Sequence, residues 1–561
     1  MKADTSNRFD TLVRRFFNGL YRTEWLLVLL IFSGSLAIRA YVLHLPGPSP
    51  DELLYVSEAE RLRVGDPLWA ASFQIAGHSL PAGLDGYQGG FPIYIHWLVS
   101  HLTDYPLRFR VINILYAVAM IGFTYFFARE FISKRAALLS ALFLATLPSQ
   151  VFFSRIGEMA IFLRVTLASA ALYYFYRWAA HRSWGAFYAG CLALGLGIST
   201  RLEIVWWLVA ALLYLILLDH ARLRQVVSHL WSYKGRALIG VTWFLIGGGL
   251  FIVYNVVTHG WTIVQITQSL VLTPGGHSNL AVFANFNKRV KHLLELLDGS
   301  SIHGMTSSYR NTLFSLAFGV AFLSLFVVSV LARLRRRPDR KGEFLLFMLI
   351  LMLLQSTFSV SRIDVIHLLV LMPIPILILV KFLDLIPFRA LISIVVVVLV
   401  AGNLWVDVRY YNRLLRAGSW GIFSPRAYSL VGELDRLGVP KVITCDWGLA
   451  NLVYYFSKGR IKVKEIFGYS HDVPASFYLA LAAAVQEPST SFLFYASPYS
   501  AFKRERAFLD YLRERGLAYQ QWVFYDNYGP IYLLYQVPRQ DRPVDRVAES
   551  GGAAGFLAGR R

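Results

Sequence analysis

Long apolar runs, separated by short polar connections, dominate the pattern of this chain. Eleven of them approach the length of about 20 helical residues that a bilayer crossing requires. They lie near 25–44, 108–128, 136–153, 158–178, 184–200, 202–218, 237–257, 311–332, 343–360, 365–381 and 390–406. This pattern predicts a polytopic α-helical membrane protein with about 11 spans.

Composition and charge agree with that interpretation. The chain has 561 residues, of which 56% are hydrophobic and 16% charged, and its formal net charge is +21. Basic residues gather in alternate connections, most densely at Arg333–Arg337. The charge therefore records membrane topology through the positive-inside rule, and it does not indicate nucleic-acid binding. We expect a plasma or inner membrane protein with a cytoplasmic N-terminus, a first span that acts as a signal anchor, and an extracytoplasmic C-terminal domain.

The polar segments define the expected domains. Residues 1–24 form a cytoplasmic leader, 25–406 the membrane domain, and 45–107 and 258–310 two long external loops. Residues 407–540 read as a small α/β domain, with strands at 441–445, 462–466, 491–495, 521–525 and 531–537, and 541–561 as a disordered tail. That domain has no GxGxxG, P-loop or GxSxG motif, so we assign it no nucleotide or hydrolase chemistry.

An acid pair, Asp51-Glu52, follows the first span directly. Ser49 and Glu52 also match a capping box, with Pro50 at the first helical position, so a purely structural role is the alternative. Asp51, Tyr55 and Glu58 recur at helical spacing and would share one face. A cap needs only one acid, which leaves Asp51 for catalysis at the membrane surface, where ionised groups are usually functional.

Further charged groups are expected at the same external surface. Arg155 and Glu158 lie at the external end of the third and fourth spans, where they could also simply pair with each other. Arg164, deeper in the fourth span, needs a partner that the sequence does not name. Candidates for holding a phosphate or a lipid are Arg155, Arg362, His367, Lys288 and Arg289, the last two on an expected interfacial helix. Arg201 and Glu203 read as a turn ion pair, and no metal-ligand spacing is present, so a divalent metal is possible but not indicated.

Several of these segments together resemble the GT-C superfamily of membrane glycosyltransferases, most closely its family 39-like branch. The branch includes polyprenyl- or dolichyl-phosphate-mannose protein mannosyltransferases and lipid A aminoarabinose transferases. The resemblance covers roughly residues 20–400 and rests on Asp51-Glu52-x-x-Tyr55, Phe91-Pro92, Pro106-Leu-Arg108, Ser154-Arg155 with Glu158, and Arg362 with His367. Phe91-Pro92-Ile93 departs from the His-Pro-Pro of many relatives, which leaves the donor and acceptor undefined.

The resemblance implies inverting transfer of a sugar from a polyprenyl phosphate to a hydroxyl group on a glycan, lipid or protein. Asp51 would be the general base, and Glu52 and Glu158 would bind acceptor or sugar hydroxyls. Tyr55 and Glu58 would line the substrate site, and Arg362, first among the basic candidates, would face the leaving phosphate. The alternatives are a transporter or flippase of a lipid-linked saccharide, which should show internal repeats and charged groups at mid-depth, and an envelope scaffold.

Overall fold

The computed structural model describes residues 24–156, 160–271, 280–358, 365–470, 472–487 and 490–538. The chain divides into two compact units, residues 1–425 and 426–561. The first unit is helical apart from one small sheet, and the second has a five-stranded sheet with helices.

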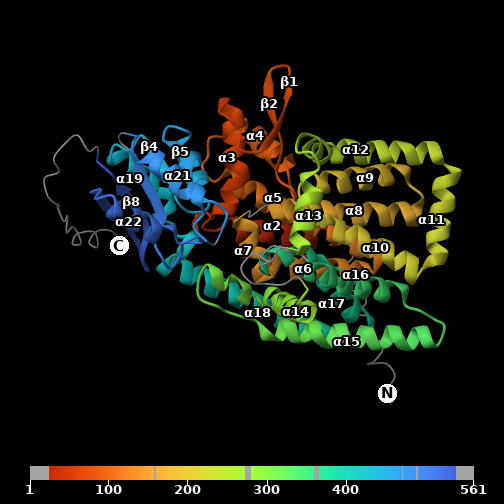
Figure 1. Ribbon diagram of the computed structural model, residues 1–561. Helices are drawn as coiled ribbons and strands as arrows, with labels where there is room; N and C mark the ends of the chain where they lie inside the picture. Colours follow the sequence, from red (N-terminus) through yellow and green to blue (C-terminus); the bar gives the residue numbers. More distant parts are fainter. Residues whose placement is uncertain are drawn as a thin grey trace. The chain divides into compact units, whose positions relative to one another are not determined.

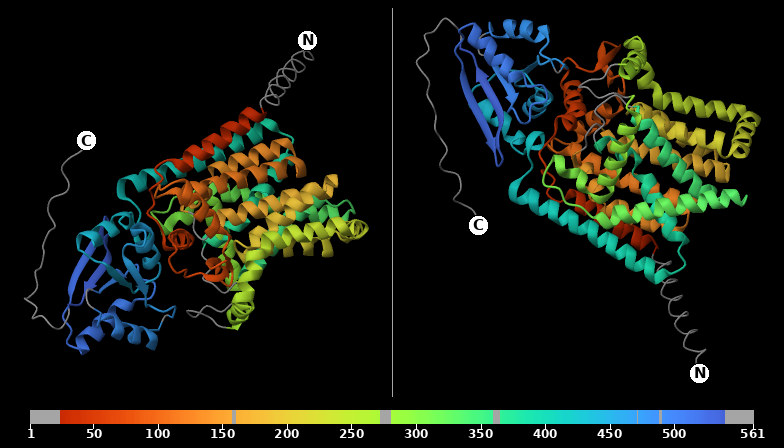
Figure 2. Two further views of the ribbon diagram at one scale, coloured as in Figure 1. Left: turned by 90° about the horizontal axis from the view of Figure 1, so that it is seen from above. Right: turned by 60° about the horizontal axis from the view of Figure 1, so that its bottom comes forward.

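Helices occupy each of the eleven segments for which apolar runs predict a span (Figure 1). They are α2 (Glu24–Ala40), α5 (Arg108–Phe131), α6 (Lys134–Thr146) with α7 (Pro148–Ile156), α8 (Ile161–His181), α9 (Trp184–Ile198), η2 (Leu202–Ile204) with α10 (Val205–Leu217), α12 (Lys234–Val257), α15 (Thr312–Leu334), α16 (Arg340–Thr357), η5 (Val365–Leu371) with α17 (Pro373–Leu385), and α18 (Arg389–Ala417). Figure 2 shows α2 and α18 side by side at one edge of this bundle.

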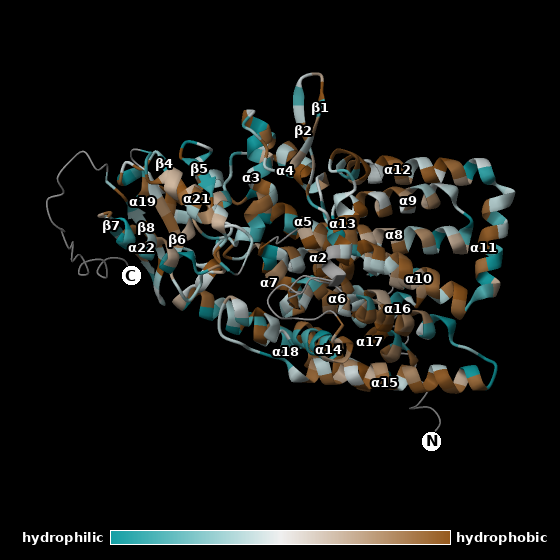
Figure 3. Cartoon of the chain, viewed as in Figure 1, coloured by the Kyte–Doolittle hydropathy of each residue, from teal (hydrophilic) through white to brown (hydrophobic). Residues whose placement is uncertain are grey.

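Within the described residues, four helices are long and apolar enough to cross a membrane alone: α5, α12, α15 and α18. Up to seven spans result if each bent pair counts as one, with bends of 59° between α6 and α7 and 52° between η5 and α17. In Figure 3 apolar residues cover most of these helices, whereas α11 (His220–Ser232) and α3 (Pro50–Val64) are largely hydrophilic. The chain is therefore an integral membrane protein, and the count of eleven spans stays a prediction.

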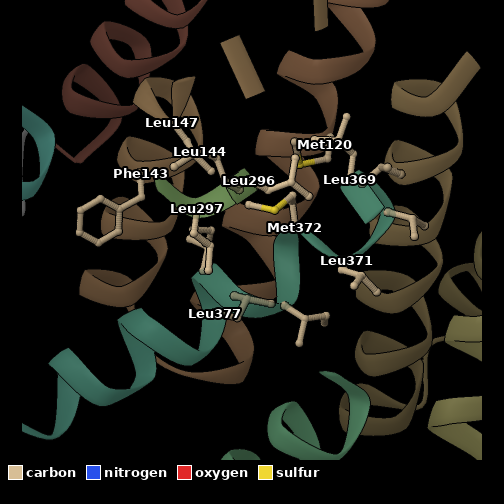
Figure 4. Packing of buried hydrophobic residues seen from close by; sticks show 14 of the residues in the cluster. Met120, Phe143, Leu144, Leu147, Leu296, Leu297, Leu369, Leu371, Met372 and Leu377 are labelled. Atoms are coloured by element: carbon tan, nitrogen blue, oxygen red, sulfur yellow. The ribbon is translucent and has the colours of Figure 1, made fainter. Parts of the chain in front are cut away.

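The core of the first unit lies where α5, α6, η5 and α17 meet (Figure 4). Helix α14 (Val282–Asp298) belongs to the second long loop, yet its Leu296 and Leu297 are fully buried in this core. The expectation that this segment is an interfacial helix is thus incomplete. Its apolar face packs inside the protein, because its leucines recur at helical spacing and face other buried side chains.

Both external loops contain ordered elements. The first holds α3 (Pro50–Val64), a small sheet of β1 (Ala71–Ile75), β2 (His78–Asp85) and β3 (Gln88–Gly89), and α4 (Phe91–Leu102). The helical spacing after Pro50 predicts α3, whereas the β1–β2 hairpin, which projects beyond α3 and α4 in Figure 1, is not predicted. Its turn is Ala76–Gly77, and both residues have positive φ, as a two-residue hairpin turn requires. The second loop holds α13 (Trp261–Val271), α14 and η4 (Ser300–Gly304).

The second unit is a mixed α/β layer structure. Strands β4 (Lys441–Thr444), β5 (Lys462–Glu465), β6 (Ser491–Tyr495), β7 (Gln520–Asp526) and β8 (Gly529–Gln536) lie in the order β5-β4-β6-β8-β7. Strand β4 is parallel to β5 and β6, and β8 is antiparallel to β6 and β7. Strands thus occupy all five segments where the sequence predicts them. The helices are α19 (Ala427–Arg436), α20 (Leu449–Ser457), α21 (Ala475–Ala484) and α22 (Arg504–Glu514).

The boundary between the units differs from the expected position at 407. Helix α18 continues to Ala417, and its Tyr410, Tyr411 and Leu414 join the core of the first unit. The charged residues Arg409, Arg413 and Arg416 interrupt the apolar run, so the hydropathy pattern ends the span too early. The buried aromatic face keeps this stretch in the first unit.

Candidate active site

Helix α3 begins with a capping box. The Ser49 side chain accepts a hydrogen bond from the Glu52 backbone N–H at 3.2 Å, and Glu52 Oε2 accepts one from the Ser49 N–H at 3.3 Å. Both carboxylate oxygens of Glu52 also accept hydrogen bonds from Arg110, each at 2.8 Å. Burial raises the pKa of Glu52, and Arg110 opposes that rise. Glu52 thus joins the start of α3 to α5, and this geometry favours a structural role over its predicted contact with substrate.

Asp51 takes no part in the capping box. It is partly buried at the first turn of α3, and the Arg201 guanidinium acts on it electrostatically. Burial raises the pKa of Asp51 to about 7, and Arg201 limits that rise. A carboxyl group that titrates near neutral pH is well suited to take a proton from a substrate hydroxyl.

Arg201 belongs to a buried ion network at the turn between α9 and α10. Its Nε lies 2.8 Å from Glu203 Oε1, and Arg164 Nη1 of α8 lies 2.8 Å from Glu203 Oε2. Both guanidinium groups are buried. One carboxylate thus joins two cations from different helices, and Glu203 is the partner that Arg164 requires inside a span.

The end of the β-sheet docks on this turn through the backbone. The Gly89 N–H donates to the Thr200 carbonyl at 3.1 Å, and the Leu202 N–H donates to the Tyr87 carbonyl at 3.0 Å. A Cβ on Gly89 would lie 2.0 Å from the Ser199 carbonyl oxygen, so this approach requires glycine. The guanidinium of Arg201 lies 5.1 Å from the centre of the Tyr87 ring. The first loop is therefore fixed against the charged turn.

Tyr55 lies one helical turn after Asp51. Its hydroxyl donates to Gln88 Oε1 at 3.4 Å, and Arg201 acts on it electrostatically as it does on Asp51. Burial raises the pKa of Tyr55, so its phenol stays protonated and can donate a hydrogen bond. The structure thus brings Asp51, Tyr55, Gln88 and Arg201 to one place.

Glu58 does not join this group. Its Oε2 accepts hydrogen bonds from the N–H groups of Trp69 and Ala70 at 3.0 and 2.9 Å, and its Oε1 lies 3.4 Å from Arg61 Nε. Burial raises the pKa of Glu58, and the two N–H groups oppose that rise. The carboxylate holds the chain that leads from α3 to β1, so the predicted contact with substrate has no support in this geometry.

Arg155 is fully buried at the end of α7. Its Nη2 donates to the Tyr41 carbonyl at 2.8 Å and to the Val42 carbonyl, and its guanidinium lies 5.0 Å from the centre of the Tyr411 ring. These contacts hold the chain just after α2. The geometry favours a structural role over the predicted contact with phosphate.

The other basic candidates, Lys288, Arg289 and His367, differ in burial and in their contacts. On α14, Lys288 is exposed, whereas Arg289 is buried and its Nε donates to the Ser356 carbonyl at 3.2 Å. His367 of η5 is buried and acts electrostatically on Glu203, which connects it to the network around Arg201. Of these candidates, His367 is thus the one that the structure relates to the Asp51 group.

Two predicted site residues, Glu158 and Arg362, lie outside the described residues. Within the described part of the chain, no three His, Cys, Asp or Glu side chains are arranged to hold a metal ion.

The sequence interpretation missed the central place of Arg201 and Glu203. It treats them as a turn ion pair, which the structure confirms, but it does not connect them with Asp51. One signal was available: an Arg164 inside a span needs an acid, and Glu203 follows the fifth span, at the next external connection of the predicted topology.

Comparisons with known proteins agree with this architecture. The family model described as dolichyl-phosphate-mannose-protein mannosyltransferase matches residues 91–246. No curated protein sequence matches the chain significantly. The structure of ArnT from Cupriavidus metallidurans bound to undecaprenyl phosphate has a TM-score of 0.59 and 12% identity, with 92% of this chain and 98% of that chain covered.

A second solved structure is also similar. The oligosaccharyltransferase AglB from the archaeon Archaeoglobus fulgidus, in complex with an inhibitory peptide and a dolichol-phosphate, has a TM-score of 0.51 and 12% identity over 93% of this chain and 75% of that chain. The chain therefore shares the fold of these two solved structures. At this level of identity the likeness is one of fold.

Proposed function

We propose that this protein transfers a sugar from a polyprenyl-phosphate donor to a hydroxyl acceptor at the extracytoplasmic membrane surface. The observation that carries this proposal is the partly buried carboxyl of Asp51, whose pKa of about 7 is set by burial and by Arg201. The fold supports it, since the neighbours of this fold were solved with undecaprenyl phosphate or dolichol-phosphate bound.

The reaction is a single displacement at the anomeric carbon. Asp51 accepts the proton of the acceptor hydroxyl while that oxygen forms its bond to the anomeric carbon. The bond from this carbon to the phosphate oxygen breaks, and polyprenyl phosphate leaves with the electron pair, so the anomeric centre is inverted. A general base of this kind contributes about 10²–10⁴-fold to the rate.

The surrounding residues would position the substrates. Tyr55 offers a phenol that stays protonated and can donate to a sugar oxygen. Arg201 keeps part of the Asp51 population ionised at neutral pH. Arg362 remains the proposed partner of the leaving phosphate, and it precedes η5, the element of His367, by three residues in the sequence.

The proposed orientation follows from charge. Arg222 and Arg224 lie on α11, which follows the end of α10 opposite to Arg201, and the run Arg333–Arg337 begins in the last turn of α15. Placing these basic residues in the cytoplasm puts Asp51 and the second unit outside.

The transporter alternative is less well supported. A transporter is expected to bind its substrate near the membrane midplane between repeats. Here the sequence shows no obvious internal repeat. Asp51 lies in the first turn of α3, and Arg201 and Glu203 lie at the turn between α9 and α10, so none of the three is midway along an expected span.

The test is product formation in proteoliposomes with donor and acceptor on the same side of the membrane. The donor is the lipid extract of cells that lack the protein, and the readout is released polyprenyl phosphate. Asp51→Asn should abolish release, while Asp104→Asn, an exposed acid in the same loop, should leave it unchanged. Near-normal release from Asp51→Asn would return the acid pair to a helix cap. Saccharide movement across the bilayer without release of polyprenyl phosphate would favour the transporter.

A further inference from the structure

A cavity of about 610 Å³ lies between the start of α2, the start of α6 and the connection from α17 to α18. Its apolar lining includes Leu27, Leu138 and Leu139, and its basic lining consists of Lys134, Arg135 and Arg389. The volume falls within the range of about 300–1,000 Å³ that small-molecule sites occupy. The cavity thus combines an apolar wall with three cations.

The cavity and the Asp51 group lie at opposite ends of the helices. Glu24, another lining residue, begins α2, whereas Ala40 ends it ten residues before α3 starts at Pro50. Under the orientation proposed above, on which this inference rests, the cavity opens at the cytoplasmic leaflet.

The two acids at the cavity are already engaged. Glu24 Oε1 accepts hydrogen bonds from Tyr125 at 2.6 Å and from Arg129 at 2.9 Å. Asp384 Oδ1 accepts one from the Ser133 hydroxyl at 2.8 Å. The basic residues at the cavity outnumber the two acids, Glu24 and Asp384, so the local net charge is positive and favours an anionic ligand. These basic residues are Arg129, Lys134, Arg135 and Arg389.

Apolar side chains are exposed along α18, the helix whose Arg389 and Ser393 line the cavity. Leu391, Ile394 and Val397 are 50%, 61% and 65% exposed, on a helix that is long and apolar enough to cross a membrane. A ligand with a charged head and long apolar chains could place its head in the cavity and its chains along this surface.

We propose that the cavity binds the headgroup of an anionic phospholipid from the cytoplasmic leaflet. Basic pockets between membrane helices on this side are suited to such headgroups, and the inner leaflet is rich in anionic lipid. The leader of this chain is a poorer occupant, because its own basic residues would be repelled by the cavity; they are Lys2, Arg8, Arg14, Arg15 and Arg22.

The test measures the binding of phosphatidylglycerol to the purified full-length protein by native mass spectrometry, with phosphatidylcholine as the neutral comparison. The wild-type protein should bind phosphatidylglycerol more tightly than phosphatidylcholine. Each basic residue near an anionic surface contributes about fivefold, so Arg135→Ala with Arg389→Ala should weaken binding by about 30-fold. Arg222→Ala with Arg224→Ala removes the same charge from the exposed face of α11 and should change little.

A second variant fills the cavity without changing its charge. The Ser393 hydroxyl donates to the Arg389 carbonyl of its own helix at 3.1 Å, and Ser393 lines the cavity. Ser393→Trp should therefore reduce phosphatidylglycerol binding while the basic residues remain. Asp51→Asn should leave lipid binding unchanged, so failure of this site and failure of the proposed reaction are distinguishable.

Three results would overturn the proposal. One is equal binding of the two lipids, and another is equal loss of binding in the cavity and α11 variants. The third is unchanged binding in Ser393→Trp, which would mean that lipid or leader contacts lie elsewhere.

Discussion

Replacing Arg201 by glutamine removes the cation that holds down the pKa of Asp51. An opposite charge within about 4–6 Å lowers a carboxyl pKa by about 1–3 units. With a starting pKa of about 7, half of Asp51 is ionised at pH 7. A rise of about one unit would leave about a tenth ionised, and the rate at pH 7 would fall about fivefold.

The direction in which Arg201→Gln shifts the pH dependence of the rate is specific to a general base. Asp51 acts when ionised, so activity is lost as pH falls through its pKa, and Arg201→Gln should move that acid limb to higher pH. Activity should recover towards pH 9. Arg201→Lys keeps the charge and should keep the position of the limb, although it loses the geometry of the Glu203 pair.

The assay is release of polyprenyl phosphate from proteoliposomes across pH 5–9 under donor saturation. Thermal unfolding of each variant provides the control for folding, because Glu203 keeps its second partner, Arg164, after the substitution. A rate that falls equally at every pH, with the acid limb in place, would refute the link between Arg201 and Asp51.

Asp51→Asn should also stabilise the protein at pH 8. The pKa of Asp51 is about 7 in the folded protein and ordinarily 3.8, so ionising this carboxyl lowers the stability of the fold, an effect that is absent below about pH 4. Equal melting temperatures of the two proteins at pH 8 would contradict this. Arg110→Met should destabilise the protein by about 3–5 kcal/mol, since it leaves the buried Glu52 carboxyl without its ion-pair partner. Chemical denaturation measures the loss. Arg362→Ala should lower maximal turnover, whereas Lys288→Ala should mainly raise the donor concentration at half-maximal rate; the opposite split would exchange their roles. Single cysteines at the exposed positions His78 and Arg436 should react with a membrane-impermeant reagent in intact cells, and one at Arg337 should not. Both native cysteines are buried and should give little background. Labelling only at Arg337 would mean that the topology is inverted.

Local patterns predicted most of the helices and all five strands of the second unit. Apolar runs located the membrane helices, and alternating apolar residues located the strands of the second unit, because each signal depends on neighbours along the chain. The capping box at Ser49 and Glu52 was also readable, since both partners lie within four residues. The end of α18 was misplaced, because charged residues mask the buried aromatic face that continues past 406.

The roles of the charged residues could not be predicted from local sequence. Glu52, Glu58 and Arg155 share their chemistry with catalytic groups, and only their partners distinguish them: Arg110, two backbone N–H groups, and the carbonyls after α2. Those partners are up to 114 positions away, so no local pattern contains them.

The sequence by itself determined that this is a membrane protein with a polar first loop, and it singled out Asp51 at the start of a helix. Hydropathy and capping act over one or two turns of chain, and the residues that produce them are adjacent. Only the tertiary structure decided that Arg201 and Glu203, from the turn between α9 and α10, lie near Asp51 and Tyr55. That grouping depends on helix packing and on the close contact of Gly89 with the Ser199–Thr200 backbone, which bring distant segments together. The pKa of a carboxyl group depends on the burial and the neighbouring charges that result from this packing.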